Sequence, residues 1–233
     1  SQIQMPSFFP SQFKVENSTP GVYQEQRQLW ESHVCVVGCG GLGGYIIEYL
    51  ARVGVGRLTV VDGDRFEPSN LNRQLLCTQP LLGSLKAEAA AARIRSIHPE
   101  ITVKAIADFF TQENADDLLT GCDLVMDGLD NPRSRLILET HCESLGVPIV
   151  HGAIRGWNAQ VAVCPPGSGL LHRLYSGVEP PANKSSLSFT AAFCAALQCA
   201  EAIKLLCHRD APLTGKLLIM DLLSLKADLV ALY

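Results

Sequence analysis

The sequence predicts an α/β fold: a Rossmann-like, mainly parallel sheet with helices on both faces and antiparallel additions in the C-terminal part. Short apolar runs alternate with segments of helical periodicity along most of the chain, which is typical of a parallel sheet covered by helices. A strand, a glycine-rich turn, a helix and a second strand also follow one another between His33 and Asp62. That succession is the usual beginning of a nucleotide-binding sheet.

The glycine-rich turn is the centre of the prediction. The run Val34–Val37 suits a strand buried on both faces, and Ile46–Val53 follows with apolar residues at helical spacing. Between them stand Gly38, Gly40, Gly41, Gly43 and Gly44. Glycine permits a tight turn and close approach of backbone N–H groups to a phosphate. A turn that only packs is the alternative.

The second strand strengthens the nucleotide interpretation. Leu58–Val61 is apolar and ends at Asp62, about 20 residues past the turn, where a carboxylate accepts hydrogen bonds from ribose hydroxyls. The following segment, 63–83, has no clean period and predicts a long functional loop. Residues 84–97 then predict an alanine-rich helix with Ser84 as N-cap.

The middle of the chain continues the alternation of strands and helices. Strands are predicted over 101–106, 123–126 and 147–150, and short helices over 111–119 and 133–145. Pro132 occupies the first position of the latter helix, and Gly146 ends it. Later segments are a strand over 159–163, a mobile crossover over 165–187, a helix over 189–206 and a final strand over 216–220.

Length and charge limit the alternatives. We expect an N-terminal arm over 1–20 and a single domain over 21–233, which opens with a short helix over 22–31. The net charge of −4 provides no general attraction for nucleic acid or an anionic membrane. The longest apolar stretch, 191–207, is interrupted by Gln198, Glu201 and Lys204, so no membrane span is predicted.

The nine cysteines indicate the compartment. Six of them lie in or beside apolar periodic segments: Cys35, Cys39, Cys122, Cys142, Cys199 and Cys207. This predicts buried, reduced thiols in a cytoplasmic protein, without a disulfide framework. The N-terminal residues show no basic region followed by an apolar one, so no secretory signal is expected.

Polar residues follow the predicted parallel strands, at the edge where such sheets bind ligands. They are Asp62, Asp64, Asn70, Arg73 and Lys86 after the second strand, Asp127, Asp130, Asn131 and Arg135 after the next buried one, and His151 and Arg155 after the fourth. Cations together with a carboxylate for a hard metal suit a triphosphate held with Mg²⁺. A nicotinamide dehydrogenase has no need of this cluster, so ATP is favoured.

Six segments carry a family resemblance: GCGGLGG, VVDGDRFEPSNLNRQ, GSLKAEAA, MDGLDNPRSR, IVHGAIRGWNAQVAV and ALQCAEAIKLL. They resemble the successive motifs of the ThiF/HesA/MoeB family, the bacterial relatives of ubiquitin-activating enzymes. The resemblance covers residues 24–223. It implies an adenylyltransferase that activates the C-terminal glycine carboxylate of a small ubiquitin-fold sulfur carrier protein and releases pyrophosphate from ATP.

The resemblance also implies roles for individual residues. Arg73, Lys86 and Asp130 would be catalytic, with Asn70 beside them on the phosphates and Asp130 positioning Mg²⁺. The full nucleotide-binding set would be Gly38, Gly40, Gly41, Leu42, Gly43, Asp62, Asp64, Asn70, Arg73, Gln74, Lys86, Asp130 and Asn131. Asp62 would hold the ribose, and the glycine turn would hold the α-phosphate.

Structural alternatives remain open for several of these residues. For Arg73 the alternative is a solvated charge on the loop, and for Lys86 it is a surface residue of its helix. A cation is poorly placed at a helix N-terminus, which favours a phosphate partner for Lys86. Asp130 or Asn131 is suited to capping the next helix. Arg135 is open to a plain ion pair with Asp130.

The sequence departs from the family in its cysteines. It contains no C-x-x-C pair, so we expect no zinc site. The crossover contains no cysteine, and Cys194, at the start of the helix that follows, is the nearest candidate for a covalent intermediate. Its apolar neighbours favour a core thiol, and adenylation without a thioester step is preferred. His151 and His172 are taken as single histidines without partners.

The resemblance extends to partners. It implies a ThiS-like or MoaD-like carrier ending in Gly-Gly, in thiamine or related sulfur-transfer biosynthesis, and a homodimer. Three alternatives are kept: a dehydratase that adenylates a carboxylate on a tRNA base, an NAD-dependent oxidoreductase, and a catalytically silent partner subunit. The net charge makes nucleic acid a less favoured partner.

Overall fold

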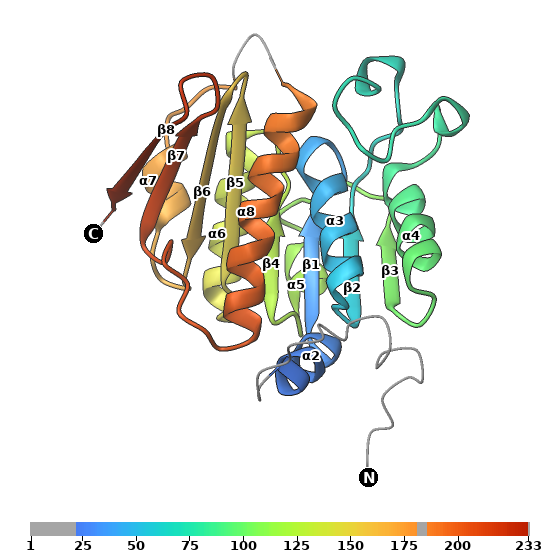
Figure 1. Cartoon of the computed structure of the whole chain (residues 1–233), viewed down its shortest axis with the longest axis horizontal. Coiled ribbons are helices and arrows are strands. Elements are labelled where there is room, and N and C mark those ends of the chain that lie inside the picture. The colour runs from blue at the N-terminus through green and yellow to red at the C-terminus, as the bar shows by residue number, and fades with distance from the viewer. Residues whose placement is uncertain (1–21, 181–185, 233) are drawn as a thin grey trace.

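A computed structural model describes residues 22–180 and 186–232. Its eight-stranded sheet has the order β3-β2-β1-β4-β5-β6-β7-β8 (Figure 1). The strands are β1 (His33–Val37), β2 (Arg57–Val61), β3 (Thr102–Ile106), β4 (Leu124–Asp127), β5 (Ile149–Arg155), β6 (Asn158–Cys164), β7 (Lys216–Asp221) and β8 (Lys226–Ala231). The first five are parallel and the last three are added antiparallel, which confirms the predicted fold class.

Helices cover both faces of the sheet. They are α2 (Val22–Glu31), α3 (Gly41–Val53), α4 (Lys86–Ile97), α5 (Ala115–Leu119), α6 (Pro132–Leu145), α7 (Leu170–Tyr175) and α8 (Ser188–Leu206). Figure 1 shows α3, α4 and α8 in front of the sheet and α5 and α6 behind it. Two 3₁₀ turns, Pro68–Asn70 and Gln79–Leu81, lie in the long loop after β2.

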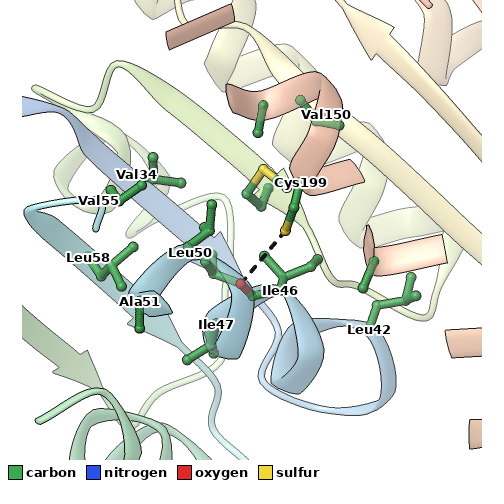
Figure 2. Close-up of a cluster of buried hydrophobic side chains, with 14 of the residues drawn as sticks. Val34, Leu42, Ile46, Ile47, Leu50, Ala51, Val55, Leu58, Val150 and Cys199 are labelled. Atoms are coloured by element: carbon green, nitrogen blue, oxygen red, sulfur yellow. Dashed lines mark hydrogen bonds between the residues drawn. The ribbon is translucent and has the colours of Figure 1, made fainter. Parts of the chain in front are cut away.

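Each face of the sheet has its own core. In front, Ile46 and Leu50 of α3 pack with Val34 of β1 and Leu58 of β2 (Figure 2). Cys199 of α8 donates its S–H to the Ile46 carbonyl at 3.8 Å, so α3 and α8 are in direct contact. The rear core contains Leu119, Leu138 and Leu171, from α5, α6 and α7. Because alternate residues of a strand point to opposite faces, strands that are apolar throughout supply both cores.

The parallel strands end at one edge of the sheet. Val37 is in register with Val61 of β2 and with Asp127 of β4, so three strands finish side by side. The chain continues from β1 to β2 on one side and reaches β4 on the other. Such a reversal of strand order leaves a crevice between the loops, and ligands bind there in open α/β sheets.

Several element bounds differ from prediction. Helix α4 begins at Lys86 with Leu85 as N-cap, so Ser84 is not its cap. Helix α5 begins only at Ala115, because Asn114 accepts a hydrogen bond from the Thr111 N–H and forms a turn before the helix. Strand β5 continues to Arg155, since β6 pairs with it along its whole length.

Two elements were not predicted. The segment taken as a mobile crossover contains α7, whose backbone N–H groups at Leu171 and His172 each donate to the Glu139 carboxylate at 2.7 Å. A carboxylate on a neighbouring helix thus anchors a helix of only six residues, whose apolar spacing is too short to stand out within a Pro- and Gly-rich segment. Strand β8 is exposed at all six residues and pairs only with β7, so it lacks the buried face that sequence patterns detect.

Other predictions concern the ends of the chain and the cysteines. The predicted arm over 1–20 lies outside the described residues. All nine cysteines are free and buried, which confirms the thiol prediction. Among the described helices, α8 alone is long and apolar enough by composition to cross a membrane, and half of its apolar window is buried inside the protein.

Candidate functional site

A cavity of about 580 Å³ lies at the edge where the parallel strands end, within the size range of small-molecule sites. Loops after β1, β2 and β4 form one side of it, and β5, β6 and β7 form the other. Predicted residues that line it are Gly38, Gly40, Gly41, Leu42, Asp62, Asp64, Arg73, Gln74, Lys86, Asp130 and Asn131. Of the predicted nucleotide-binding set, Gly43 and Asn70 do not line it.

The glycine turn combines packing with an open helix end. A Cβ on Gly43 would lie 1.7 Å from the Gly38 carbonyl oxygen, and Gly38 itself has a φ of +95°. A Cβ on Gly41 would meet nothing within 4 Å. Packing therefore requires Gly38 and Gly43, whereas Gly40 and Gly41 expose the N-terminal end of α3 to the cavity. Such an end attracts an anion.

The Asp62 side chain is held in place by two backbone hydrogen bonds. Its Oδ2 accepts the Cys39 N–H at 2.8 Å, and its Oδ1 accepts the Asp64 N–H at the same distance. Burial raises the pKa of Asp62, and these two backbone hydrogen bonds oppose the rise. The carboxylate thus holds the glycine turn against the end of β2, with lone pairs left for hydroxyl donors.

The long loop presents Arg73 and Gln74 to the cavity. Arg73 donates to the Ser69 carbonyl at 2.7 Å and to the Asn72 side chain at 2.9 Å. Gln74 is buried, and its Oε1 has no partner among the described residues. Asn70 lies outside the cavity wall, where it caps a 3₁₀ turn by accepting the Glu67 N–H. Its position favours a structural role in shaping the loop.

Lys86 has a carboxylate partner. Its Nζ lies 3.2 Å from Asp64 Oδ2, and its side chain is only 8% exposed. Asp64 therefore compensates electrostatically for the unfavourable position of a cation at a helix N-terminus. The Asp64 backbone oxygen also accepts the Lys86 N–H. The lysine still contributes to the cavity wall, so a phosphate can share it with Asp64.

In and after the loop that follows β4, the structure distinguishes between the predicted roles of Asp130, Asn131 and Arg135. Asn131 is the N-cap of α6, since its Oδ1 accepts the Ser134 N–H at 2.9 Å. Asp130 therefore does not serve as the cap and lines the cavity. Arg135 pairs at 3.1 Å with Asp127, which is fully buried at the end of β4. Burial opposes the charge of Arg135, but the charges of Asp127 and, more weakly, Asp130 raise its pKa.

His151 and His172 both have partners, so that prediction was wrong. His151 is buried, with Nδ1 2.7 Å from Asp127 Oδ2 and Nε2 3.1 Å from the Tyr175 hydroxyl. His172 Nδ1 lies 2.7 Å from Glu139 Oε2. Tyr175 and Gln160 of this network line the cavity and were not predicted. A signal existed: Asp127 and His151 each follow the last predicted residue of adjacent parallel strands.

Cys194 is a core thiol. It lies within α8 and is fully buried, with Sγ near the carbonyls of Ala153 and Gln160. Burial raises its pKa to about 12, which is the opposite of what a nucleophile at neutral pH requires. The predicted core role is therefore supported by both position and acidity.

The described residues contain no group of three or more His, Cys, Asp or Glu side chains that could hold a metal ion. A divalent ion beside Asp130 would therefore need oxygen ligands from elsewhere, such as substrate phosphates and water. Mg²⁺ is commonly held in that way, by one or two carboxylates together with phosphate oxygens.

Comparison with known proteins gives a consistent picture. The model of the ThiF family matches residues 12–232. The SAMP-activating enzyme E1 of Haloferax volcanii is 35% identical over 211 residues, which cover 88% of this chain and 78% of that protein. The sulfur carrier protein adenylyltransferase of Thermus thermophilus is 38% identical over 210 residues, 85% of this chain and 78% of that protein.

Two further matches are more partial. The tRNA threonylcarbamoyladenosine dehydratase of Haemophilus influenzae is 39% identical over 124 residues, 53% of this chain and 48% of its own. A crystal structure of E. coli MccB with ATP superposes with a TM-score of 0.78 over 90% of this chain and 66% of that one. At 20% identity, the latter similarity establishes the fold alone.

Proposed function

This chain belongs to the ThiF family, and we propose that it is an adenylyltransferase that activates the C-terminal glycine carboxylate of a small ubiquitin-fold sulfur carrier protein with ATP. One observation carries the proposal. A single cavity joins the glycine turn, Asp62, Arg73, Lys86 and Asp130 on one side to an extended groove wall from β5, β6 and β7 on the other. The first side suits a nucleotide, and the second suits a chain end.

The residues present fit ATP. The α3 N-terminus and the close-packed glycines leave backbone N–H groups facing the cavity, as a phosphate requires. The fixed carboxylate of Asp62 suits ribose hydroxyls. The buried Gln74 Oε1 accepts no hydrogen bond from the described residues, so a donor of a ligand can bond to it. Arg73 and Lys86 supply positive charge for the phosphate oxygens.

In the proposed reaction the carrier carboxylate attacks the α-phosphorus of ATP. A bond forms between a carboxylate oxygen and phosphorus, and the bond to the pyrophosphate oxygen breaks, which gives an acyl adenylate. Arg73 and Lys86 stabilise negative charge on the phosphates, and Asp62 and the glycine turn fix the nucleotide. Mg²⁺, which Asp130 would hold, supplies neutralisation of phosphate charge. No cysteine of this chain takes part in that step.

The partner and setting are part of the same proposal. The carrier is a ThiS-like or MoaD-like protein ending in Gly-Gly, in thiamine or related sulfur-transfer biosynthesis. The homodimer implied by the family resemblance is expected in solution and is checked by sedimentation velocity. Free, buried cysteines favour a reducing compartment, so the cytoplasm is the proposed location.

ATP–pyrophosphate exchange, measured with and without a Gly-Gly carrier, tests the proposal. Arg73→Ala should lower the exchange rate by about 10²-fold, as loss of a transition-state charge contact does. Its thermal unfolding should not change, because the hydrogen bonds of the Arg73 side chain within the described part of the chain go to its own loop. A folded wild type that binds ATP but shows no exchange with any candidate carrier would refute the function.

A tRNA-base dehydratase remains a second candidate, because residues of this chain align with such an enzyme at 39% identity. It predicts tRNA binding that weakens steeply with salt, and exchange that needs no carrier. An NAD-dependent oxidoreductase would instead bind NADH tightly without Mg²⁺, which a fluorescence titration detects. A silent partner subunit would bind neither nucleotide.

A further inference from the structure

A buried polar network lies where β4 and β5 meet and reaches the cavity through Arg135, Tyr175 and Gln160, which line it. Four of its members come from four elements: Asp127 from β4, Arg135 from α6, His151 from β5 and Tyr175 from α7. All four are buried. The proposed reaction as described above uses none of them, so their presence beside the cavity needs an explanation.

The charge of Asp127 assigns the hydrogen-bond directions in this network. Asp127 is an acceptor, so the Nδ1–H of His151 donates to its Oδ2 at 2.7 Å. Nε2 of a neutral imidazole then accepts, from the Tyr175 hydroxyl at 3.1 Å and from the Gln160 amide at 3.2 Å. The Gln160 amide also donates to the Tyr175 oxygen at 2.6 Å. A continuous chain of donors thus runs from the cavity wall at Gln160 to Asp127.

Charge and burial agree with this assignment. Burial lowers the pKa of His151, which keeps the imidazole neutral. Burial alone would raise the pKa of Asp127, but the Arg135 charge and the His151 hydrogen bond outweigh it and hold the pKa below the usual value. The network therefore contains one anion, Asp127, and one cation, Arg135.

Arg135 is held on one edge and open on the other. Its Nε donates to Asp127 Oδ2 at 3.1 Å, and its Nη2 donates to the carbonyls of Leu129 and Gly152 at 2.6 and 3.1 Å. Its guanidinium carbon lies 4.8 Å from the centre of the Tyr175 ring. Within 22–180 and 186–232, Nη1 makes no hydrogen bond. Arg135 lines the cavity, so this nitrogen is available to a ligand.

The position of Arg135 favours a carboxylate ligand. Its Nη2 joins the Leu129 carbonyl, in the loop after β4, to the Gly152 carbonyl of β5, and its guanidinium contacts the Tyr175 ring. The loop after β4 packs against the glycine turn, since a Cβ on Gly38 would lie 2.6 Å from the Gly128 carbonyl oxygen. The cation therefore stands between the side proposed for the nucleotide and the side proposed for the chain end, where the attacking carboxylate has to meet the α-phosphate. An arginine edge matches a carboxylate geometrically and electrostatically.

We propose that the Nη1 edge of Arg135 receives the attacking glycine carboxylate, and that Asp127, His151 and Tyr175 are positioning residues that hold the guanidinium in place. The inference rests on the proposed function. A carboxylate that enters a buried site loses water, and a fixed cation compensates for that loss while aiming one oxygen at the α-phosphorus. The hydroxyl of Tyr175 stops rotation of His151, which in turn keeps Asp127 on the inner edge of Arg135.

Three variants and one control test the proposal by ATP–pyrophosphate exchange with a carrier. Arg135→Lys keeps the charge but loses the open edge. Tyr175→Phe removes only the hydroxyl, and His151→Asn keeps a donor to Asp127 but loses the acceptor for Tyr175. His172→Asn is the matched control, because it makes the same substitution at a histidine whose Nδ1 lies equally close to a carboxylate, at 2.7 Å, between α7 and α6 outside the cavity.

Each of the three variants should raise the KM for the carrier by about tenfold, the order expected from a misplaced reacting group. The KM for ATP should stay within about twofold, and His172→Asn should change neither. Equal effects on both KM values would show that the network serves the nucleotide. Lower thermal stability of Tyr175→Phe and His151→Asn with an unchanged KM for the carrier would show that it is only structural. Either result overturns the proposal.

A second measurement does not depend on catalysis. Wild type saturated with a non-hydrolysable ATP analogue is titrated with N-acetyl-Gly-Gly, and the arginine Nε–H signals are followed by NMR, with the Arg135 signal identified by its loss in Arg135→Lys. A shift of that signal is expected, and its absence overturns the inference. A shift without any exchange would refute the proposed function but keep the carboxylate site. If the wild type catalyses exchange and the three variants have unchanged KM values for the carrier, the proposed function is kept and the carboxylate site is refuted.

Discussion

At the scale of single residues, the structure separates positions that shape the cavity from positions available to a ligand. Gly43 and Asn70 were both predicted to bind nucleotide, yet neither lines the cavity. Gly43 is required because the Gly38 carbonyl occupies the place of a Cβ, and Asn70 caps a turn. Arg73 and Gln74, in the same loop as Asn70, do line it. Adjacent residues of one motif therefore divide structural and chemical roles.

Gly43→Ala tests this division. A Cβ placed 1.7 Å from a carbonyl oxygen forces the turn apart, so we expect a loss of about 3 kcal/mol in unfolding free energy, measured by urea denaturation. Gly41→Ala is the matched control, since its Cβ meets nothing within 4 Å. It should leave stability unchanged or raise it by up to about 1 kcal/mol. Equal losses in the two variants would contradict the packing argument.

Cys194 provides a second prediction at this scale. Because burial raises its pKa to about 12, it should form no thioester with a carrier. Cys194→Ala should keep wild-type exchange within about twofold and lose about 1 kcal/mol of stability. Non-reducing gels of enzyme, ATP and carrier are the direct check. A thiol-sensitive conjugate that disappears in Cys194→Ala would disprove the assignment.

At the scale of elements, burial decides which segments the sequence reveals. Strands β1, β2 and β4 are buried on both faces and read as apolar runs. Strand β8 is exposed on both faces, and α7 is anchored by a carboxylate from α6. Strand β8 has no buried apolar face, and α7 has only six residues within a Pro- and Gly-rich segment, so both were missed. Strand β8 depends on its pairing with β7, whereas α7 also buries Leu170 and Leu171 in the rear core.

This difference predicts unequal costs of substitution in one hairpin. Leu217 on β7 is 5% exposed and belongs to the rear core, so Leu217→Ala should cost about 2–5 kcal/mol. Leu229 on β8 is 55% exposed, so Leu229→Ala should cost less than about 0.5 kcal/mol. Urea denaturation of the isolated variants measures both. A large loss at Leu229 would mean that another surface covers β8.

At the scale of the whole molecule, one sheet edge collects the chemistry from segments far apart in the sequence. The cavity takes residues from the loops after β1, β2 and β4 and from β5, β6 and β7. Beside it, Asp127 and Arg135 form a buried ion pair next to neutral His151. Groups of this kind couple the stability of the whole fold to pH.

The sign of that coupling follows from His151. Burial lowers its pKa below the usual value of 6.5, whereas the unfolded chain titrates near that value. As pH falls below 6.5, the unfolded state gains a proton that the folded state does not, so stability falls by at most about 1.4 kcal/mol per pH unit. The charged or titratable groups around His151 are Asp127, Arg135, Glu139 and Tyr175. Asp127, whose pKa is lowered, adds a loss of the same sign below 3.8.

His151→Asn isolates this contribution. It removes the titrating group, so the stability of the variant should fall less steeply than that of the wild type between pH 6.5 and pH 5, as measured by urea denaturation at each pH. A constant offset between the two proteins reflects lost contacts and is not the readout. Identical slopes would show that His151 does not titrate between the folded and unfolded states.

The sequence by itself determined the parallel part of the sheet, the glycine-rich turn and most of the cations that line the cavity. Those features depend on local patterns: apolar runs, glycines at fixed spacing and charges directly after strands. Only the tertiary structure decided that Arg135 pairs with Asp127, that His151 and Tyr175 complete the buried polar network, and that α7 and β8 exist. Each of these depends on contacts between segments distant in sequence, and such contacts form only when the strands are placed side by side.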